Sequence, residues 1–564
     1  MASAIAGWLG HLGAKGALYN SRGDRAAKLV RLARRKKQPA NTHGQVRWQI
    51  LVIVAIAAKI LLALHVGMSC TPDSVDYERI GNAIVSGGVL AKPIDLHVKP
   101  RADFIANIAF RMIGYPSVIS IAKILLGKGW LLGILILQVT GSLVTCFLIY
   151  EMLRVLSFQP VFALGAAIFY GVSPVLDLDQ AVLTDSLYAS LVSCFAIIIG
   201  TDIVLNRPMT VPKALCIGLL LAVAMMLREA TQFLALSFLP LAALWSIRTR
   251  TLIVNRLMLV LALFLPLVVT VASYCYWHEL RSGKSFVTTT AQFNAFASLF
   301  ETEAYRQLHH PAQPSVFNTN GPVDTVARQA KMDCRAGTAD ADRVCAERSN
   351  ASRIVDLNLR LSKQFGLDSL EIAEMATQKY LSLWRTRPGL MLGSMAGRAA
   401  IALTVLRPLD LRFAFESPPL DITVLKPIDF SSKAKSPSCT ENLNRDSAGR
   451  RYPWALHIVY VLGKVMAVII FVSSLIAFVW TTGAVALGAM FFRHREASLQ
   501  QLVVVAFGVV VWGFLFFYAA VHMESRFMQP VAPLMLISFL IAARDLWRHC
   551  NEVTKRFIAD LQNL

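Results

Sequence analysis

The sequence predicts an all-α polytopic membrane protein with about ten transmembrane helices, from its composition and from the length of its apolar runs. Of 564 residues, 55% are hydrophobic and 16% are charged, and the mean hydropathy is +0.53, so a water-soluble fold is not expected. The runs from Trp130 to Tyr150 and from Leu502 to Ala520 reach the roughly 20 residues that a helix needs to cross the hydrocarbon. These runs are predicted to span the membrane.

The basic residues indicate the topology. The formal net charge is +21, but Lys and Arg gather at the ends of apolar runs and in the first 47 residues, so nucleic acid is not an expected partner. The segment from Lys15 to Arg47 contains ten Lys or Arg residues and one acidic residue, Asp24. By the positive-inside rule this segment is cytoplasmic, either as an anchor to anionic lipids or only as a retention signal. It does not resemble a cleaved signal peptide, so the first span is expected to remain.

Under this topology the chain divides into five segments. They are residues 1–47, a basic cytoplasmic segment; 48–277, an N-terminal transmembrane module whose outer loops carry the candidate site; 278–453, an extracytoplasmic domain; 454–543, the C-terminal transmembrane helices; and 544–564, a cytoplasmic tail.

The apolar pattern predicts the elements of the two membrane regions in order. They are a span near 48–66, a polar stretch to 129, a span over 130–153, a short return helix over 160–172, a descent to 205, and after the extracytoplasmic domain a re-entry near 454 with crossings at 502–521 and 527–543. The run from Ala214 to Trp245 is interrupted by Arg228 and Glu229, which predicts two short crossings with an outer turn. No internal repeat typical of transporters is visible.

The extracytoplasmic domain is predicted to be mixed but mainly helical. Residues Tyr380 to Leu406 alternate aromatic, aliphatic and basic types, which fits a helix at the membrane interface or a helix in a soluble core. Cys334 and Cys345 lie where disulfides persist, and we predict that they pair. Four other cysteines in apolar stretches should behave as small hydrophobes, and no metal-ligand spacing is present. They are Cys146, Cys194, Cys216 and Cys275.

Several ionisable residues that adjoin spans fall on the outer side of this topology. They are Asp73, Asp76, Asp185, Arg228, Glu229, Glu524 and Arg526. Charges at membrane depth are costly, so such residues tend to line a polar cavity or pathway. Any one of them could instead lie at headgroup level, where charge costs little. Their gathering on one face favours a shared site.

The segment Thr71-Pro72-Asp73-Ser74-Val75-Asp76-Tyr77 predicts the start of a helix just after the first span. Thr71 is at the cap position and Pro72 at the first helical position. Asp73, Asp76 and Tyr77 then share one face, because they are three and four residues apart. Asp73 could merely interact favourably with the helix dipole. The functional alternative is a general base that takes the proton from an attacking hydroxyl.

Arg228 and Arg526 have the chemistry for a leaving phosphate. A guanidinium binds phosphate oxygens in a bidentate way. The alternative is that each arginine reaches for the interface or pairs with its acidic neighbour, Glu229 or Glu524.

These residues resemble the GT-C membrane glycosyltransferases, which include the protein O-mannosyltransferases and the lipid A aminoarabinose transferases. The resemblance is carried by short motifs in both membrane regions and does not cover the extracytoplasmic domain. The motifs are Pro72-Asp73-Ser74 with Tyr77, Gly114-Tyr115-Pro116, Ser173-Pro174, Thr184-Asp185-Ser186, Leu227-Arg228, and Glu524-Ser525-Arg526-Phe527 before Pro530 and Pro533. Two departures from the mannosyltransferase pattern are Ser74 in place of an adjacent Glu, and Met112-Ile113 after Arg111 in place of Pro.

The resemblance implies roles for individual residues. Asp73 matches the catalytic carboxylate of the first outer loop, and Asp185 matches the acidic residue that assists substrate or metal binding. Together with the residues that the outer-face pattern indicates, the candidate catalytic set is Asp73, Asp76 and Asp185, and the candidate substrate-binding set is Tyr77, Arg111, Tyr115, Arg228, Glu229, Glu524 and Arg526. A divalent cation stays open, with Asp73 and Asp185 as its ligands if one is used.

The resemblance also implies a donor and a reaction. The donor is a polyprenyl-phosphate sugar, the acceptor is a glycan, lipid or protein, and the anomeric carbon is inverted. The protein is then an integral protein of the bacterial inner membrane, with its site facing the periplasm or exterior and assembling cell-envelope material. Two other interpretations remain, a transporter or flippase of lipid-linked or polar substrates, and a non-catalytic scaffold.

Overall fold

The computed structural model describes most of the chain between residues 56 and 562. The described ranges are 56–57, 59–60, 68–70, 72–86, 90, 93–98, 111–172, 178–179, 181–247, 252–336, 350–404, 426–427, 439, seven residues between 465 and 479, 499–521 and 525–562. The chain separates into two compact units, Met1–Ala58 and Lys59–Leu564. The first unit lies almost entirely outside the described ranges.

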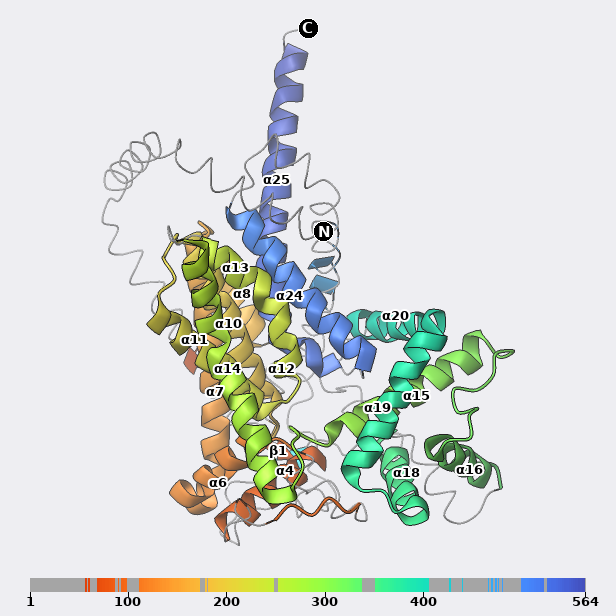
Figure 1. Ribbon diagram of the computed structural model, residues 1–564. Coiled ribbons are helices and arrows are strands. Elements are labelled where there is room, and N and C mark those ends of the chain that lie inside the picture. The colour runs from red at the N-terminus through yellow and green to blue at the C-terminus, as the bar shows by residue number, and fades with distance from the viewer. Residues whose placement is uncertain are drawn as a thin grey trace. The chain divides into compact units, whose positions relative to one another are not determined.

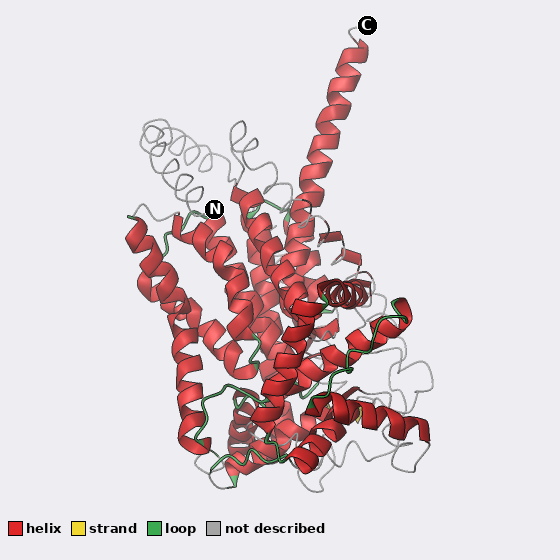
Figure 2. Ribbon diagram, turned by 45° about the vertical axis from the view of Figure 1, so that its right-hand side comes forward, coloured by secondary structure: helices red, strands yellow, loops and turns green. Residues whose placement is uncertain are grey.

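The membrane region is a bundle of apolar helices (Figures 1 and 2). They are α6 (Gly114–Leu126), α7 (Trp130–Val155), α8 (Pro160–Gly171), α10 (Asp185–Val204), α11 (Val211–Leu227), α13 (Leu239–Ile247), α14 (Ile253–Ser282), α24 (Leu499–Val521) and α25 (Ala532–Gln562). Short helices connect some of them: η1 (Gly127–Gly129), α12 (Thr231–Leu234), η2 (Ala235–Phe238) and η3 (Ser525–Val531). α11 ends at Leu227 and α12 begins at Thr231, so the helix break predicted at Arg228 and Glu229 is present.

Five helical stretches of the described chain are long and apolar enough to cross a membrane. They are Gly114–Val155, Asp185–Val204, Ile253–Ser282, Gln500–Val521 and Phe527–Ala559, and three shorter apolar helices are Pro160–Gly171, Val211–Leu227 and Thr231–Ser246. The chain is thus an integral membrane protein, but the predicted count of about ten spans is not confirmed. The predicted spans near 48–66 and after 454 fall mostly outside the described ranges.

Two element predictions need correction. Residues 114–126 were expected within a polar stretch, but they form the apolar helix α6, whose Ile124 and Leu125 are exposed. The segment Tyr380 to Leu406 was expected as one helix, but α19 (Ser369–Thr386) ends and α20 (Pro388–Thr404) begins within it. Pro388 explains the break, since proline starts a helix but cannot continue one.

Close backbone approach holds α11 against α14. An added Cβ on Gly218 would lie 2.1 Å from the carbonyl oxygen of Leu263. Helices in lipid pack through small residues of this kind, because the hydrophobic effect offers little to drive their association there.

A second core lies outside the bundle in a group of helices that we call the helical module. Its members are α15 (Thr290–His309), α16 (Pro322–Ala336), α18 (Asn350–Phe365), α19 and α20. They bury Phe296, Leu357 and Ile372 among themselves, together with Leu383 of α19 and Met391 of α20. Of the two interpretations of the 380–406 segment, this burial favours a core helix. The described part of the predicted extracytoplasmic domain is therefore mainly helical.

The helical module caps the end of α24. The Arg398 guanidinium donates from Nε to the Ala519 carbonyl at 2.6 Å, and the hydroxyls of Tyr380 and Ser298 donate to the Ala520 carbonyl at 2.5 and 3.1 Å. The last carbonyls of a helix lack partners within it, and a cation beside them interacts favourably with the dipole. α24 is therefore fixed at the end from which the chain continues to η3.

A two-stranded ribbon and a disulfide join distant segments. β1 (Ser69–Cys70) pairs antiparallel with β2 (Lys426–Pro427), and Cys70 is bonded to Cys439, 369 residues away. This bond was not predicted from the sequence. The predicted pair of Cys334 and Cys345 stays a prediction, because neither side chain lies in the described part of the chain.

Candidate active site

The helix α4 (Pro72–Val85) presents its acidic face to one arginine. The helix starts at Pro72 as predicted, whereas Thr71 lies outside the described ranges. Nη2 of Arg111 is 2.7 Å from Oδ1 of Asp73 and 3.6 Å from Oδ2 of Asp76. The same guanidinium lies over the Tyr77 ring, 5.2 Å from its centroid. The predicted shared face of Asp73, Asp76 and Tyr77 is therefore real, and Arg111 is its common partner.

The opposite face of α4 is fixed to the rest of the bundle. Ser74 is fully buried and donates to the Val182 carbonyl at 2.8 Å. A Glu at this position would bury a carboxylate where a hydroxyl fits, which accounts for the absence of an adjacent acidic pair. The second carboxylate is instead one turn on, at Asp76.

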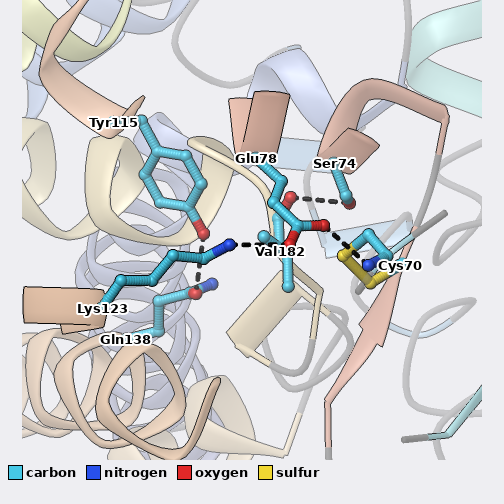
Figure 3. Close-up of a disulfide and its surroundings, with 8 residues drawn as sticks. Cys70, Ser74, Glu78, Tyr115, Lys123, Gln138 and Val182 are labelled. Atoms are coloured by element: carbon cyan, nitrogen blue, oxygen red, sulfur yellow. Dashed lines mark hydrogen bonds and ion pairs between the residues drawn. A yellow bond between two sulfur atoms is a disulfide. The ribbon is translucent and has the colours of Figure 1, made fainter. Parts of the chain in front are cut away.

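Glu78 joins three segments behind the site (Figure 3). One carboxylate oxygen accepts from Lys123 of α6 at 2.7 Å, and the other accepts from the backbone N–H of Cys439 at 2.7 Å. The disulfide to Cys70 lies directly beside it. α4 is thus held against α6 and against the segment of Cys439 at once.

Burial and charge set the protonation of this cluster. Burial raises the pKa of Asp76, and nearby Asp73 raises it further against the opposing effect of Arg111, so that the pKa is about 7. Burial lowers the pKa of Arg111, but the neighbouring Asp73, Tyr77 and Asp76 outweigh it and hold the pKa above its ordinary value. Arg111 is therefore a permanent cation, while Asp76 exchanges its proton near neutral pH.

Tyr115 links this cluster to the loop before α10. Its ring packs edge-on against Tyr77 with centroids 5.3 Å apart, and its hydroxyl donates to Oε1 of Gln138 at 3.1 Å. The Gln138 amide donates in turn to the carbonyls of Leu178 and Ala181, both at 2.9 Å. The loop before α10 is therefore positioned by side chains of α6 and α7.

A second arginine–carboxylate pair lies at the start of α10. Nη1 of Arg228, just after α11, is 2.7 Å from Oδ1 of Asp185. The guanidinium stacks on the Phe527 ring at 4.3 Å and lies 5.6 Å from Tyr188 and 5.9 Å from Tyr518. Aromatic faces attract a cation. α10, α24 and η3 thus each place a ring around Arg228.

The two pairs adjoin each other. Burial raises the pKa of Tyr77, and the charge of Asp185 contributes in the same direction, against Arg111 and a hydrogen bond with the Thr184 side chain. An added Cβ on Gly114 would lie 2.3 Å from the Met226 carbonyl oxygen. The chain just after Arg111 therefore touches the chain just before Arg228.

The structure describes fewer contacts for the remaining predicted site residues. Glu229 is half-buried and interacts electrostatically with Tyr188, Tyr274 and Tyr518. Glu524 lies outside the described ranges, and only the backbone of Arg526 is described, in η3. Tyr188, Tyr518 and Gln138 were not predicted, and Phe527 was named only as part of a motif, without a role. Tyr188 follows Asp185 by three residues and Phe527 follows Arg526, so helical spacing and adjacency were the available signals.

A divalent cation held by Asp73 and Asp185 stays a prediction. Among the described side chains, no three His, Cys, Asp or Glu residues are grouped as metal ligands. Asp73 and Asp185 each have an arginine as ion-pair partner.

No family model and no curated protein matches the chain. Two solved structures are similar to it. They are ArnT from Cupriavidus metallidurans in the apo state, at 17% identity and a TM-score of 0.29 over 86% of this chain and 78% of that chain, and the same protein bound to undecaprenyl phosphate, at 13% identity and a TM-score of 0.29 over 87% and 78%. ArnT is a lipid A aminoarabinose transferase of the GT-C fold, the class that the sequence motifs resemble. A likeness at this TM-score assigns no function to the chain.

Proposed function

We propose that this protein is a membrane glycosyltransferase of the GT-C type. It transfers a sugar from a polyprenyl-phosphate donor to an acceptor hydroxyl on a glycan, lipid or protein at the extracytoplasmic face of the bacterial inner membrane. The observation that carries the proposal is the adjoining of two arginine–carboxylate pairs, Arg111 with Asp73 and Arg228 with Asp185. One pair can serve the acceptor and the other the donor phosphate.

Asp73 is the proposed general base. Its side chain keeps 29% of its surface exposed, so an acceptor hydroxyl can reach it. Asp73 takes the hydroxyl proton while the oxygen attacks the anomeric carbon from the face opposite the phosphate, which inverts that carbon. Arg111 holds Asp73 in place and brings Asp76 beside it. With a pKa of about 7, Asp76 is a second group that can accept a proton near neutral pH.

Arg228 is the proposed group for the leaving phosphate. The bond between the anomeric carbon and the phosphate oxygen breaks, and the polyprenyl phosphate leaves with one more negative charge than it had as a diester. A guanidinium stabilises that added charge by charge-assisted hydrogen bonds. Asp185 and the Phe527 ring fix the orientation of the guanidinium before the substrate arrives.

The test is the transfer of labelled sugar from a panel of polyprenyl-phosphate donors in membranes that contain the protein. Asp73→Asn should abolish transfer, since an amide cannot take the proton, while the amount of folded protein stays the same. Asp202→Asn is the matched control. Asp202 is a buried, ion-paired Asp, 2.6 Å from Lys213, and it lies about 25 Å along α10 from Asp185. It should keep transfer. Equal transfer by wild type and Asp73→Asn would remove Asp73 from its role.

A further inference from the structure

One buried ion pair lies inside the bundle apart from the two arginine pairs. Nζ of Lys59 is 2.9 Å from Oδ2 of Asp179, and the two side chains expose 5% and 0% of their surface. Lys59 also donates to the Gly171 carbonyl at 2.9 Å. A lysine and an aspartate with so little exposure are costly in an apolar bundle, and such pairs in membrane proteins usually have a role beyond packing.

Both oxygens of Asp179 are used. Oδ2 accepts from Ser142 of α7 at 2.6 Å in addition to Lys59, and Oδ1 accepts from Ser186 of α10 at 2.5 Å. The carboxylate therefore joins α7, α10 and the helical segment of Lys59 at one point. Short hydrogen bonds to a charged carboxylate are stronger than neutral hydrogen bonds, so each of these contacts restricts the position of its partner.

Asp179 is connected to the candidate site by one hydrogen bond. Ser186, its hydrogen-bond partner, is the residue after Asp185, which holds Arg228. The loop between Asp179 and Asp185 is also fixed by Gln138, through the Ala181 carbonyl, and by Ser74, through the Val182 carbonyl. The first turn of α10 thus takes its position from a polar network whose only lysine, within the described residues, is Lys59.

We propose that Lys59 and Asp179 are positioning residues that set the place of Asp185 and, through it, of the Arg228 guanidinium. The inference rests on the proposed function, since it assigns these residues to the phosphate half of that same site. A displacement of about 1 Å at a positioning group can cost about 100-fold in rate. The hydrogen bond from Ser186 is the contact that transmits the position.

A merely structural pair would behave differently. Buried ion pairs can often be replaced by apolar residues of similar volume without loss of stability. If Lys59 and Asp179 only hold the helices together, Lys59→Met combined with Asp179→Leu should therefore leave both folding and turnover intact. If Asp179 positions Asp185, the same variant should fold but turn over slowly, because Ser186 has lost its acceptor.

The matched variant is Lys59→Met combined with Asp179→Asn. Both double variants remove the two charges, but Asn keeps an oxygen that accepts from Ser186. Its amide N–H groups can donate to Ser142, whose single hydroxyl proton can then turn from residue 179 to the Val139 carbonyl, 3.0 Å away. The two variants thus differ in the hydrogen bond to Ser186 while they share the loss of charge.

The experiment measures four quantities on purified full-length protein: the melting temperature, its shift on adding undecaprenyl phosphate, and kcat and KM for sugar transfer. We expect all three proteins to melt within a few degrees of one another. The Asn variant should transfer within about threefold of wild type, and the Leu variant should lose about 100-fold in kcat together with the melting shift.

The outcomes separate the two proposals. Transfer by the Leu variant at the wild-type kcat overturns the positioning role and leaves the proposed function standing. A wild-type protein that neither transfers sugar nor shifts its melting temperature with undecaprenyl phosphate overturns the proposed function, and the positioning role with it. A proton-coupled flux in sealed vesicles that is lost in both double variants also overturns the positioning role, because the ion pair would then belong to a transport path.

Discussion

Single residues define the candidate site through two arginines that differ in their surroundings. Arg111 lies against two carboxylates and one tyrosine, whereas Arg228 lies against one carboxylate and three aromatic rings. The acidic surroundings of Arg111 suit proton transfer, since two carboxylates share one cation. The aromatic surroundings of Arg228 leave its charge less neutralised, which suits the binding of an anion.

Asp76 should give the protein a characteristic dependence of stability on pH. Its pKa is about 7 in the fold against about 3.9 in an unfolded chain, so the folded state binds more protons between these values. Stability therefore falls as pH rises from about 4 through about 7, by at most about 1.4 kcal/mol per pH unit. Melting temperatures in detergent at pH 5 to 8 should show this slope in wild type and a flatter one in Asp76→Asn. Parallel curves would contradict the assigned pKa.

Arg228→Lys should weaken the binding of undecaprenyl phosphate by about tenfold or more. Lysine keeps the charge but loses the planar fork and the stacking on Phe527, each of which depends on the guanidinium. The control is Arg544→Lys, because Arg544 also stacks on a phenylalanine, Phe158, with 4.8 Å from Cζ to the ring centroid. The readout is the ligand-induced melting shift. Equal losses in both variants would mean that a general loss of packing, and not the phosphate site, was measured.

At the scale of elements, the site exists because α4, α6, α10 and α11 end or begin near one another. Each element contributes a terminus or a first turn: Asp73 and Asp185 lie in first turns, and Arg228 directly follows a last turn. Helix termini leave backbone groups unpaired and so bring polar chemistry to an apolar bundle. This explains why the candidate residues gather at helix ends.

Gly114 should be indispensable to this meeting of helix ends. An alanine there would place Cβ 2.3 Å from the Met226 carbonyl oxygen, which is closer than any contact allows, so α6 and α11 must separate. We expect Gly114→Ala to lower the melting temperature and reduce transfer at least tenfold. Gly165→Ala in α8 is the control, because nothing lies within 4 Å of its added Cβ; it should stabilise the helix by up to about 1 kcal/mol. Unchanged transfer by Gly114→Ala would show that α6 can shift without disturbing the site.

At the scale of the whole molecule, covalent and polar links connect the membrane helices to segments far along the chain. The Cys70–Cys439 bond fixes the segment before α4 to a segment near Glu78, and Arg398 fixes the helical module to the end of α24. Both links act close to the candidate site, since α4 carries Asp73 and α24 carries Tyr518. We propose that the helical module influences which acceptor is used.

The disulfide should be detectable and should stabilise the fold. After free thiols are blocked, digestion without reduction should release a peptide pair that joins Cys70 and Cys439. Replacing both cysteines by serine should cost about 2–5 kcal/mol of stability. The same digest tests the predicted Cys334–Cys345 bond. Alkylation of Cys70 and Cys439 before any reduction would show that the bond does not form in the membrane.

The sequence determined the features that depend on local pattern. Hydropathy over about 20 residues indicated the membrane class, helical spacing placed Asp73, Asp76 and Tyr77 on one face, and a charged interruption predicted the break after Leu227. Boundaries with weak signals were missed, such as α6 and the break at Pro388. The functional roles of the site residues remain proposals at every scale.

Only the tertiary structure decided which distant residues meet. Arg111 and Asp73 are 38 positions apart, Cys70 and Cys439 are 369 apart, and the rings around Arg228 come from three separate elements. The periodicity of one segment carries no information on which other segment packs against it, because that choice depends on the summed packing of the whole bundle. For the same reason Lys59, a single charge in an apolar run, gave no sign in the sequence that Asp179 was its partner.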